Sequence, residues 1–156
     1  MKPVIIDILE FNRTLRRQIG KEYSWGEEVS IDEINDVTTR WDCSELLQVI
    51  FNKFGSKLPD GSQNQFNFCI PVDDHRVGDL GFSGTGPKGI NHVFYLIDRA
   101  TVIEARGKPY NQVILRPRFA WESWKGFQGW RRVPDVEFNW PDGRPVRDYS
   151  KLQLPG

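Results

Sequence analysis

The chain has few residues of the kinds that build metal sites and disulfide frameworks. Its 156 residues include only two cysteines, Cys43 and Cys69, and two histidines, His75 and His92. Two cysteines allow at most one bridge, and neither a Cys-x-x-Cys nor a His-Glu-x-x-His spacing is present. The sequence therefore predicts no bound metal and no cofactor.

Long apolar runs and an excess of either charge are also missing. No stretch approaches the roughly 18 apolar residues that a membrane-spanning helix needs. The short apolar segment near the N-terminus, residues 4–6, is followed by Asp7 and Glu10, which is not the pattern of a signal peptide. Basic and acidic residues balance at 21 each, so no global field favours nucleic acid or an anionic membrane. We expect neither as a partner.

What the chain does have is enough length for one well-buried core and an unusual number of aromatic residues. A chain of this size buries about 70% of its unfolded surface on folding. Aromatic residues make up 13% of it, including six tryptophans, which favours an aromatic core or a stacking surface for a ligand. Apolar residues spaced for a helix predict one over residues 5–20, ending at Gly20. Trp121, Trp124, Phe127 and Trp130 recur at threes, which predicts a helical or near-helical stripe packed in the core.

The stretch from residue 40 to residue 51 is the most informative in the chain. Its polar residues Asp42, Cys43 and Ser44 stand where an apolar helical stripe begins. That stripe consists of Leu46, Leu47, Ile50 and Phe51. Cys43 is therefore predicted at a helix N-terminus, where unpaired backbone N–H groups and the helix dipole stabilise a thiolate. The alternative is that Cys43 is simply a small buried residue at a helix start.

Two later stretches supply the partners that a thiol nucleophile needs. Residues 91–98 and 100–105 read as two strands joined by a short turn, with His92 near the start of the first and Glu104 near the end of the second. On antiparallel neighbours this spacing of 12 residues brings the two side chains together. A histidine base with an orienting carboxylate would complete a Cys-His-Glu triad. The other histidine, His75, lies among charged turn residues, and we expect it to have no catalytic role.

Four short motifs occur in an order that resembles a known family. They are Asp42-Cys43-Ser44 before an apolar helix, Gly78-Asp79-Leu80 before a strand, His92-Val93 opening a strand, and Val102-Ile103-Glu104-Ala105. Upstream, the Gly-x-x-Tyr-x-x-Gly pattern of residues 20–26 contains Tyr23. Together these residues look like the NlpC-type cysteine peptidases of bacterial cell walls, over a region from about Ile8 to about Val133.

The resemblance implies a fold, a substrate and roles for further residues. The expected fold is α+β with a papain-like core, in which N-terminal helices pack on an antiparallel sheet of about five or six strands. The implied substrate is a peptidoglycan stem peptide, cut between D-glutamate and a diamino acid. Tyr23 would place its hydroxyl beside the nucleophile, while Asp42 and Ser44 would bind a free substrate amine. The chain departs from the family pattern twice, with Glu45 where glycine is usual and Glu104 where histidine is most common.

Several alternatives stay open at this stage. One is an amidase that cuts between muramic acid and L-alanine, or an acyltransferase on the same core. Another, from a different class, is a cell-wall binding module with a vestigial site. We expect a monomer with a peptidase domain over residues 1–133 and an extension or linker over residues 134–156. A wall substrate without a signal peptide would suit a released lysin or a phage-associated enzyme, although the sequence does not assign a location.

Overall fold

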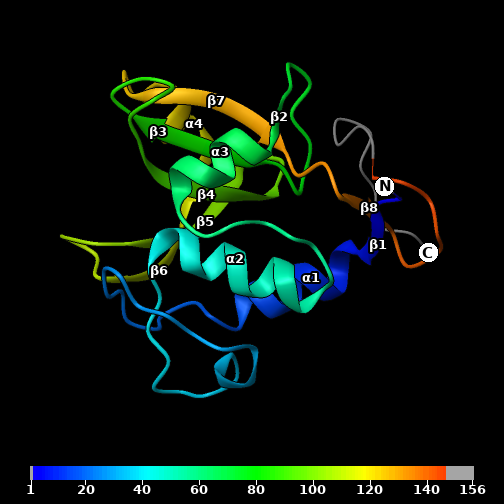
Figure 1. The fold of residues 1–156 in the computed structure, drawn as a ribbon, viewed down its shortest axis with the longest axis horizontal. Helices are drawn as coiled ribbons and strands as arrows, with labels where there is room; N and C mark the ends of the chain where they lie inside the picture. The colour runs from blue at the N-terminus through cyan, green and yellow to red at the C-terminus, as the bar shows by residue number, and fades with distance from the viewer. Residues whose placement is uncertain (1, 147–156) are drawn as a thin grey trace.

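The computed structural model describes residues 2–146 and has an α+β architecture (Figure 1). The chain begins with β1 (Val4–Asp7), α1 (Ile8–Arg16), the 3-10 helix η1 (Ile31–Glu33), α2 (Cys43–Lys53) and α3 (Ser62–Phe68). It continues with β2 (Ile70–Pro71), β3 (Leu80–Gly84), β4 (Ile90–Asp98), β5 (Thr101–Arg106), β6 (Gln112–Pro117), α4 (Arg118–Glu122), β7 (Phe127–Arg132) and β8 (Val136–Asn139). Among residues 2–146 no helix is both long and apolar enough to cross a membrane.

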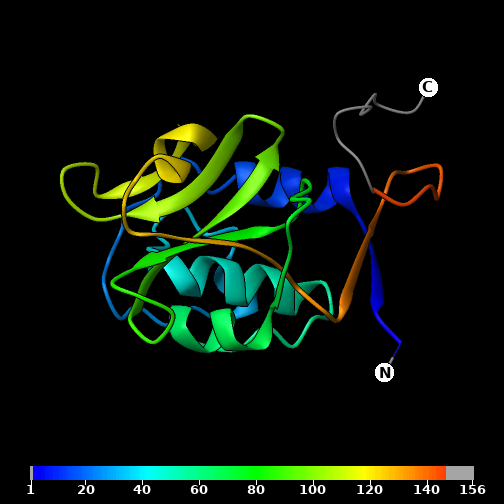
Figure 2. The same ribbon diagram turned by 90° about the horizontal axis from the view of Figure 1, so that it is seen from above.

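Six strands form one antiparallel sheet in the order β2-β7-β3-β4-β5-β6. Helices α2 and α3 lie along one side of this sheet, as Figure 2 shows. This arrangement confirms the predicted α+β fold with helices packed on an antiparallel sheet of five or six strands. Strands β4 and β5 are neighbours in this order, which matters for the site because they carry His92 and Glu104.

Helix α2 covers one face of the sheet with the apolar stripe that the sequence predicts. The four stripe residues, Leu46, Leu47, Ile50 and Phe51, are each at most 1% exposed. They pack in one cluster with alternate residues of β4, among them Val93, Tyr95 and Ile97. Full burial of side chains of this size contributes about 1.5–3 kcal/mol each. The position of Cys43 at the start of α2 is therefore fixed by a helix whose apolar side chains are fully buried.

The opposite face of the sheet carries an aromatic cluster, and here one sequence prediction is wrong. Helix α4 ends at Glu122, so Phe127 and Trp130 lie in strand β7 and not on a continuous helix. Gly129 has a φ of 99° in β7, and the register with β3 shifts at this point. Such a bulge adds one residue to the strand, so residues three apart can share a face. Phe127 and Trp130 both pack on Phe94, which reproduces a helical spacing within a strand.

The two ends of the described chain meet in a small parallel sheet beside the main one (Figures 1 and 2). Strand β1 pairs with β8, with Val4 opposite Val136 and Asp7 opposite Asn139. The helix predicted over residues 5–20 is therefore shorter, because residues 4–7 form β1 and Asp7 caps α1 by accepting from the Leu9 and Glu10 backbone N–H groups.

The segment after residue 133 packs against the body of the protein as far as it is described. Trp140 and Val146 are 8% and 5% exposed and belong to the same apolar cluster as Ile8. Residues 147–156 of the predicted extension lie outside the described residues. The division of the chain at residues 133 and 134 stays a prediction.

Candidate active site

Cys43 is the first residue of α2 and its side chain is nearly buried, with 7% of the residue exposed. The preceding residue, Asp42, has an extended backbone and occupies the N-cap position, but its side chain makes no capping hydrogen bond. Its carboxylate instead accepts from the Gly26 backbone N–H at 2.8 Å. The first N–H groups of α2 are thus left without a side-chain cap, and the positive end of the helix is available to stabilise a Cys43 thiolate.

His92 and Glu104 lie side by side on β4 and β5. The distance from His92 Nε2 to Glu104 Oε1 is 2.7 Å, and the Glu104 side chain is fully buried. Because Nε2 is used in this way, Nδ1 is the ring nitrogen left for the hydrogen bond between His92 and Cys43. The structure therefore aligns a thiol, an imidazole and a carboxylate in the order that a catalytic triad requires.

The surroundings of His92 favour its protonated form. Burial is the largest influence on its pKa and lowers it, but hydrogen bonds and charge interactions with Cys43 and Glu104 outweigh burial and raise the pKa to about 9. At neutral pH the imidazole is thus an imidazolium. An imidazolium beside Cys43 favours the thiolate form of the cysteine, which is the nucleophilic form.

Strand β4 is irregular at the residue before His92. In the pairing of β3 with β4, Ser83 lies opposite His92 and Gly84 lies opposite Ile90, so Asn91 has no partner. Bulges of this kind change the direction of a neighbouring side chain and are common next to active sites. We infer that the bulge at Asn91 sets the direction in which the His92 ring leaves the sheet.

Two residues besides His92 contact the Glu104 carboxylate. The Trp121 indole Nε1–H donates to Glu104 Oε2 at 2.6 Å, and Arg106 Nε lies 3.5 Å from Oε1. The Trp121 ring also packs 5.1 Å from the His92 ring, centre to centre. Both carboxylate oxygens are therefore engaged, and the carboxylate can neither rotate nor leave the imidazole without losing a hydrogen bond.

We expect Glu104→Gln to fold and to lose about ten- to a thousandfold in turnover, or about 1.4–4 kcal/mol at the barrier. The amide keeps the shape but removes the negative charge that raises the pKa of His92. That pKa should fall, so the imidazolium should be lost at lower pH and the basic limb of the pH–rate profile should move down from about pH 9. An unchanged rate and an unchanged profile would make Glu104 a structural strand residue.

Trp121→Phe should keep most of the packing and remove only the N–H that orients Glu104. We expect about a tenfold loss in kcat with little change in KM, because the substrate-binding surfaces stay in place. The matched control is Trp130→Phe, since Trp130 is as buried as Trp121, with 7% of the residue exposed, but donates its indole N–H to Glu122 Oε2 and not to Glu104. Equal rates for the two variants would show that the indole N–H does not position the carboxylate.

The remaining predicted site residues line a cavity of about 380 Å³ on the cysteine side of the pair. Tyr23 is held there by a bridge to Trp41, two residues before Cys43. Burial, followed by the charges of Cys43 and Asp42, raises the pKa of the Tyr23 hydroxyl to about 12, so it stays a hydrogen-bond donor. Ser44 and Asp42 line the same cavity. The structure thus brings together all six residues singled out in the sequence, and their roles stay predictions.

Comparison with known protein families identifies the family to which this arrangement of residues belongs. The model of the NlpC/P60 family matches residues 20–125, a span that contains Tyr23, Cys43, His92 and Glu104. The chain belongs to the NlpC/P60 family. The resemblance stated from the sequence motifs is therefore confirmed.

Relatives of the NlpC/P60 family include peptidoglycan hydrolases. The chain is 35% identical over 95 residues to the peptidoglycan endopeptidase RipA of Mycobacterium tuberculosis, which covers 56% of this chain and 20% of RipA. It is 29% identical over 102 residues to the probable endopeptidase p60 of Listeria innocua, covering 63% of this chain and 20% of p60. The chain thus matches only about a fifth of the length of these relatives.

Solved structures of NlpC/P60 domains have the same fold. The P60 domain of an antigen from M. avium subspecies paratuberculosis superposes with a TM-score of 0.64 at 29% identity, covering 81% of this chain and 93% of that one. RipD of M. tuberculosis superposes with a TM-score of 0.62 at 21% identity, covering 81% and 97%. RipD is described as a non-catalytic NlpC/p60 protein adapted to peptidoglycan binding. Similarity of fold alone therefore does not show whether this chain is catalytic.

Glu45, one of the two positions at which the sequence departs from the pattern it resembles, points into the protein and not into open solvent. The residue is 7% exposed, and its Oε1 accepts from the Val29 backbone N–H at 2.9 Å. Burial, followed by the nearby charges of Asp60, Glu28 and Asp42, raises the pKa of its carboxyl. Glu45 therefore ties the loop before η1 to the start of α2 and adds an acidic group to the cavity beside Cys43.

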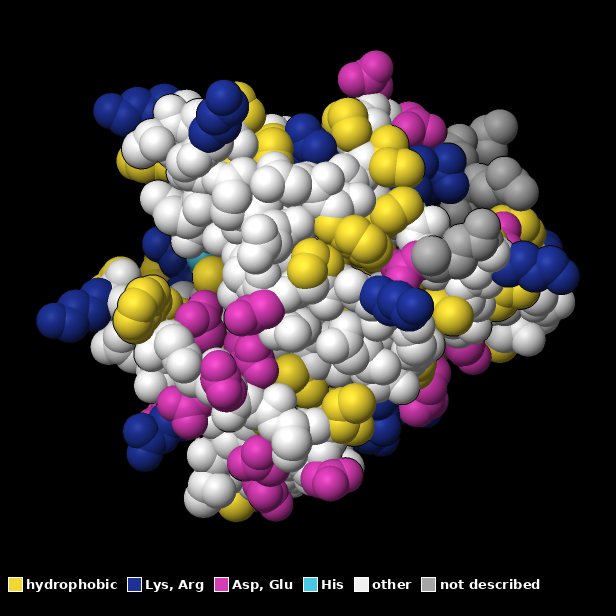
Figure 3. Space-filling view, in the orientation of Figure 1, with side chains coloured by type: hydrophobic (Ala, Val, Ile, Leu, Met, Phe, Trp, Pro, Cys, Tyr) yellow, Lys and Arg dark blue, Asp and Glu magenta, His cyan; other side chains and the backbone are white. Residues whose placement is uncertain are grey.

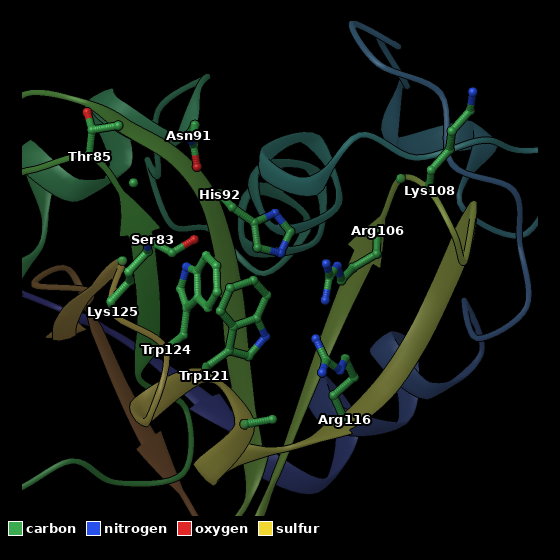
Figure 4. A pocket seen from close by; sticks show the side chains of 14 residues that line it. Ser83, Thr85, Asn91, His92, Arg106, Lys108, Arg116, Trp121, Trp124 and Lys125 are labelled. Atoms are coloured by element: carbon green, nitrogen blue, oxygen red, sulfur yellow. The ribbon is translucent and has the colours of Figure 1, made fainter.

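A larger cavity of about 870 Å³ opens on the histidine side (Figure 4). Figure 4 shows His92 beside Trp121, with Arg106 and Arg116 reaching the same space from the neighbouring strands. The sequence analysis did not predict that Trp121, Arg106 and Arg116 line the site. One signal was present, since Arg106 follows Glu104 by two residues and so shares its face of β5. The positions of Trp121 and Arg116 depend on how α4 and β6 pack, which short sequence patterns do not give.

His75 has different neighbours. Its ring stacks on Trp130 at 5.4 Å, and its Nε2 lies 3.1 Å from Arg118 Nη1. These contacts involve none of the residues around Cys43. Cys43 and Cys69 are both free and buried. In the described part of the chain no group of three or more potential metal ligands is placed to hold an ion.

Proposed function

We propose that this protein is a thiol hydrolase that cleaves a peptide bond in peptidoglycan stem peptides, between D-glutamate and a diamino acid. Cys43 is the nucleophile, His92 the general base and acid, and Glu104 the residue that orients the imidazole. The observation that carries this proposal is the 2.7 Å contact between His92 and Glu104, with the other ring nitrogen left for the thiol at the N-terminus of α2. Membership of the NlpC/P60 family supports the choice of substrate.

The proposed reaction has two steps. The Cys43 thiolate attacks the peptide carbonyl carbon and forms a C–S bond, while the oxyanion accepts hydrogen bonds from the Cys43 backbone N–H and the Tyr23 hydroxyl. The C–N bond then breaks as His92 gives its proton to the leaving nitrogen. In the second step His92 takes a proton from water, the hydroxide attacks the thioester, and the acid product and the Cys43 thiolate are released.

Specificity for the acyl part of the substrate follows from the cavity on the cysteine side. Asp42 and Ser44 flank the nucleophile and line this cavity together with Glu45. Carboxylates in a partly buried cavity favour a cationic ligand. We assign this cavity to the free amine at the start of the stem peptide.

Mass spectrometry tests the proposal on two substrates: free stem peptides, whose L-alanine carries the amine to which the cavity on the cysteine side is assigned, and purified peptidoglycan, whose L-alanine is bound to muramic acid. Wild-type protein should release fragments that begin with the free amine of the diamino acid, and Cys43→Ser should release none. A new amine on L-alanine would instead assign an amidase, and transfer to an added amine would assign an acyltransferase. If wild-type protein binds peptidoglycan but cleaves neither substrate, the protein is a binding module and the proposed reaction is wrong.

A further inference from the structure

The two cavities beside the reacting pair, one lined by Cys43 and the other by His92, have side chains of opposite charge. The cavity on the cysteine side, here called the acidic pocket, is lined by five carboxylates and by no lysine or arginine of the described chain. They are Glu27, Glu28, Asp42, Glu45 and Asp60. The cavity on the histidine side, here called the basic pocket, is lined by four cationic side chains and by no carboxylate of the described chain. They are Arg106, Lys108, Arg116 and Lys125.

Asn91, the residue before His92, borders both pockets, so the two pockets adjoin at this residue. Figure 3 shows the acidic side chains gathered in one group just below a small exposed edge of histidine, with basic side chains above and beside it. The protein as a whole has no net charge. The separation of acidic from basic side chains is therefore a local property of the cleft and not a consequence of overall composition.

The inner wall of the basic pocket is a pair of arginines held by aromatic rings. Arg106 and Arg116 lie on the same face of β5 and β6, and both approach the same two rings. The Arg106 guanidinium carbon lies 5.0 Å from the centre of the Trp121 ring and 5.1 Å from that of Tyr110. For Arg116 the corresponding distances are 5.7 Å and 5.6 Å. Stacking of this kind fixes the guanidinium groups in place without cancelling their charge.

The positive charge in this wall exceeds the negative charge available to it. Glu104 lies 3.5 Å from Arg106, but the same carboxylate oxygen already binds His92 at 2.7 Å. Arg116 makes no ion pair with any residue in the described part of the chain. Two fixed guanidinium groups and an imidazolium thus share one carboxylate. A planar anion that accepts two N–H bonds from a guanidinium would restore the balance.

The chemistry of the reaction says which part of a substrate reaches this pocket. His92 must give its proton to the leaving nitrogen, so the amine that leaves lies on the histidine side of Cys43. The basic pocket is therefore the site of the leaving group, and the acidic pocket is the site of the acyl group. Trp124, which is 53% exposed, also lines the basic pocket, beside Lys125.

We propose that the basic pocket binds a free carboxylate on the leaving-group side of the scissile bond, with Arg116 as its principal ligand. The enzyme would then distinguish stem peptides whose diamino acid carries a free carboxylate from those in which this group is amidated. The inference rests on the proposed function, since it assigns the leaving group of that same reaction. The acidic and basic pockets together would fix the direction in which the peptide lies across Cys43.

The test uses two synthetic stem peptides that differ only in a carboxylate or a carboxamide on the diamino acid. For wild-type protein we expect kcat/KM to be about ten- to a hundredfold higher for the carboxylate form, the range of a charge-assisted bidentate contact. Arg116→Gln should lose this preference, because its kcat/KM for the carboxylate peptide should fall to about its kcat/KM for the amide peptide. Arg116→Lys should keep part of the preference, because lysine keeps the positive charge but lacks the planar guanidinium that donates two parallel N–H bonds. Arg17→Gln, on the exposed end of α1, is the matched control and should not change it.

Equal cleavage of the two peptides by wild-type protein would overturn the inference, and so would an equal loss on both peptides in Arg116→Gln. Calorimetry with the free diamino acid product and its amide separates this failure from a failure of the proposed reaction. If wild-type protein cleaves neither peptide but binds the carboxylate product in an Arg116-dependent way, the reaction is wrong and the binding site is right. If it cleaves the peptides and binds both products equally, the reaction is right and the inference is wrong.

Discussion

Replacing Cys43 by serine should lower turnover by about four to six orders of magnitude, because the loss of a nucleophile removes the whole covalent route. A serine hydroxyl is far less acidic than a thiol, so the imidazolium of His92 cannot hold it as an anion. The substitution replaces one small side chain by another at a position that is 7% exposed. We therefore expect the variant to fold, with a thermal unfolding midpoint close to that of the wild type.

The second cysteine supplies the control for this experiment. Cys69 is 3% exposed, and burial raises the pKa of its thiol to about 12. Cys69→Ala should therefore keep the wild-type rate, apart from any effect of reduced stability. Activity that persists in Cys43→Ser, or that disappears in a folded Cys69→Ala, would show that the nucleophile has been assigned to the wrong residue.

Replacing His92 by alanine should remove most turnover, by about four orders of magnitude or more. The change removes the group that protonates the leaving amine and the positive charge that accompanies the thiolate. It also leaves Glu104, which is fully buried, with one partner fewer. The rate of a single turnover, measured with excess protein, isolates this chemical step from product release.

His75→Ala is the matched histidine control, because the His75 ring contacts Trp130 and Arg118 and not the residues of the site. Its rate should stay near that of the wild type. A folded His75→Ala protein without activity, together with an active His92→Ala protein, would reverse the assignment of the base.

The parts of the site that the sequence predicts depend on regular spacings between residues that are close together in the chain. The spacing of Leu46, Leu47, Ile50 and Phe51 places Cys43 at a helix start, because one face of a helix must bury apolar residues. The separation of 12 positions between His92 and Glu104 is enough to bring them together, because a short turn joins the two strands as an antiparallel pair. The structure shows both arrangements.

The parts that the sequence did not predict depend on contacts between distant segments. The hydrogen bond from Trp121 to Glu104 depends on where α4 packs after β6, and no local pattern encodes that position. The pairing of β1 with β8 joins residues more than 130 positions apart. The bulge at Gly129 gave the tryptophan stripe a helical spacing inside a strand, and a spacing count alone has no means of detecting it.

The proposed active thiol can be distinguished from a vestigial one within the same molecule. Because fold-sharing relatives include a protein described as non-catalytic, the family alone does not settle the state of Cys43. Cys69 serves as an internal reference for a thiol that is buried and inert. Reaction with iodoacetamide reports the thiolate fraction, since the thiolate is the form that reacts.

The most direct measurement is the rate of iodoacetamide modification of Cys43 and Cys69 at pH 6, followed by peptide mapping, with free cysteine in the same solution. The thiolate–imidazolium pair predicts that Cys43 reacts faster than free cysteine, that hydrolytic activity is lost in step with its modification, and that Cys69 stays unmodified. In His92→Ala the reaction of Cys43 should slow to the rate of free cysteine or below. A Cys43 that reacts no faster than free cysteine in the wild-type protein would contradict the account.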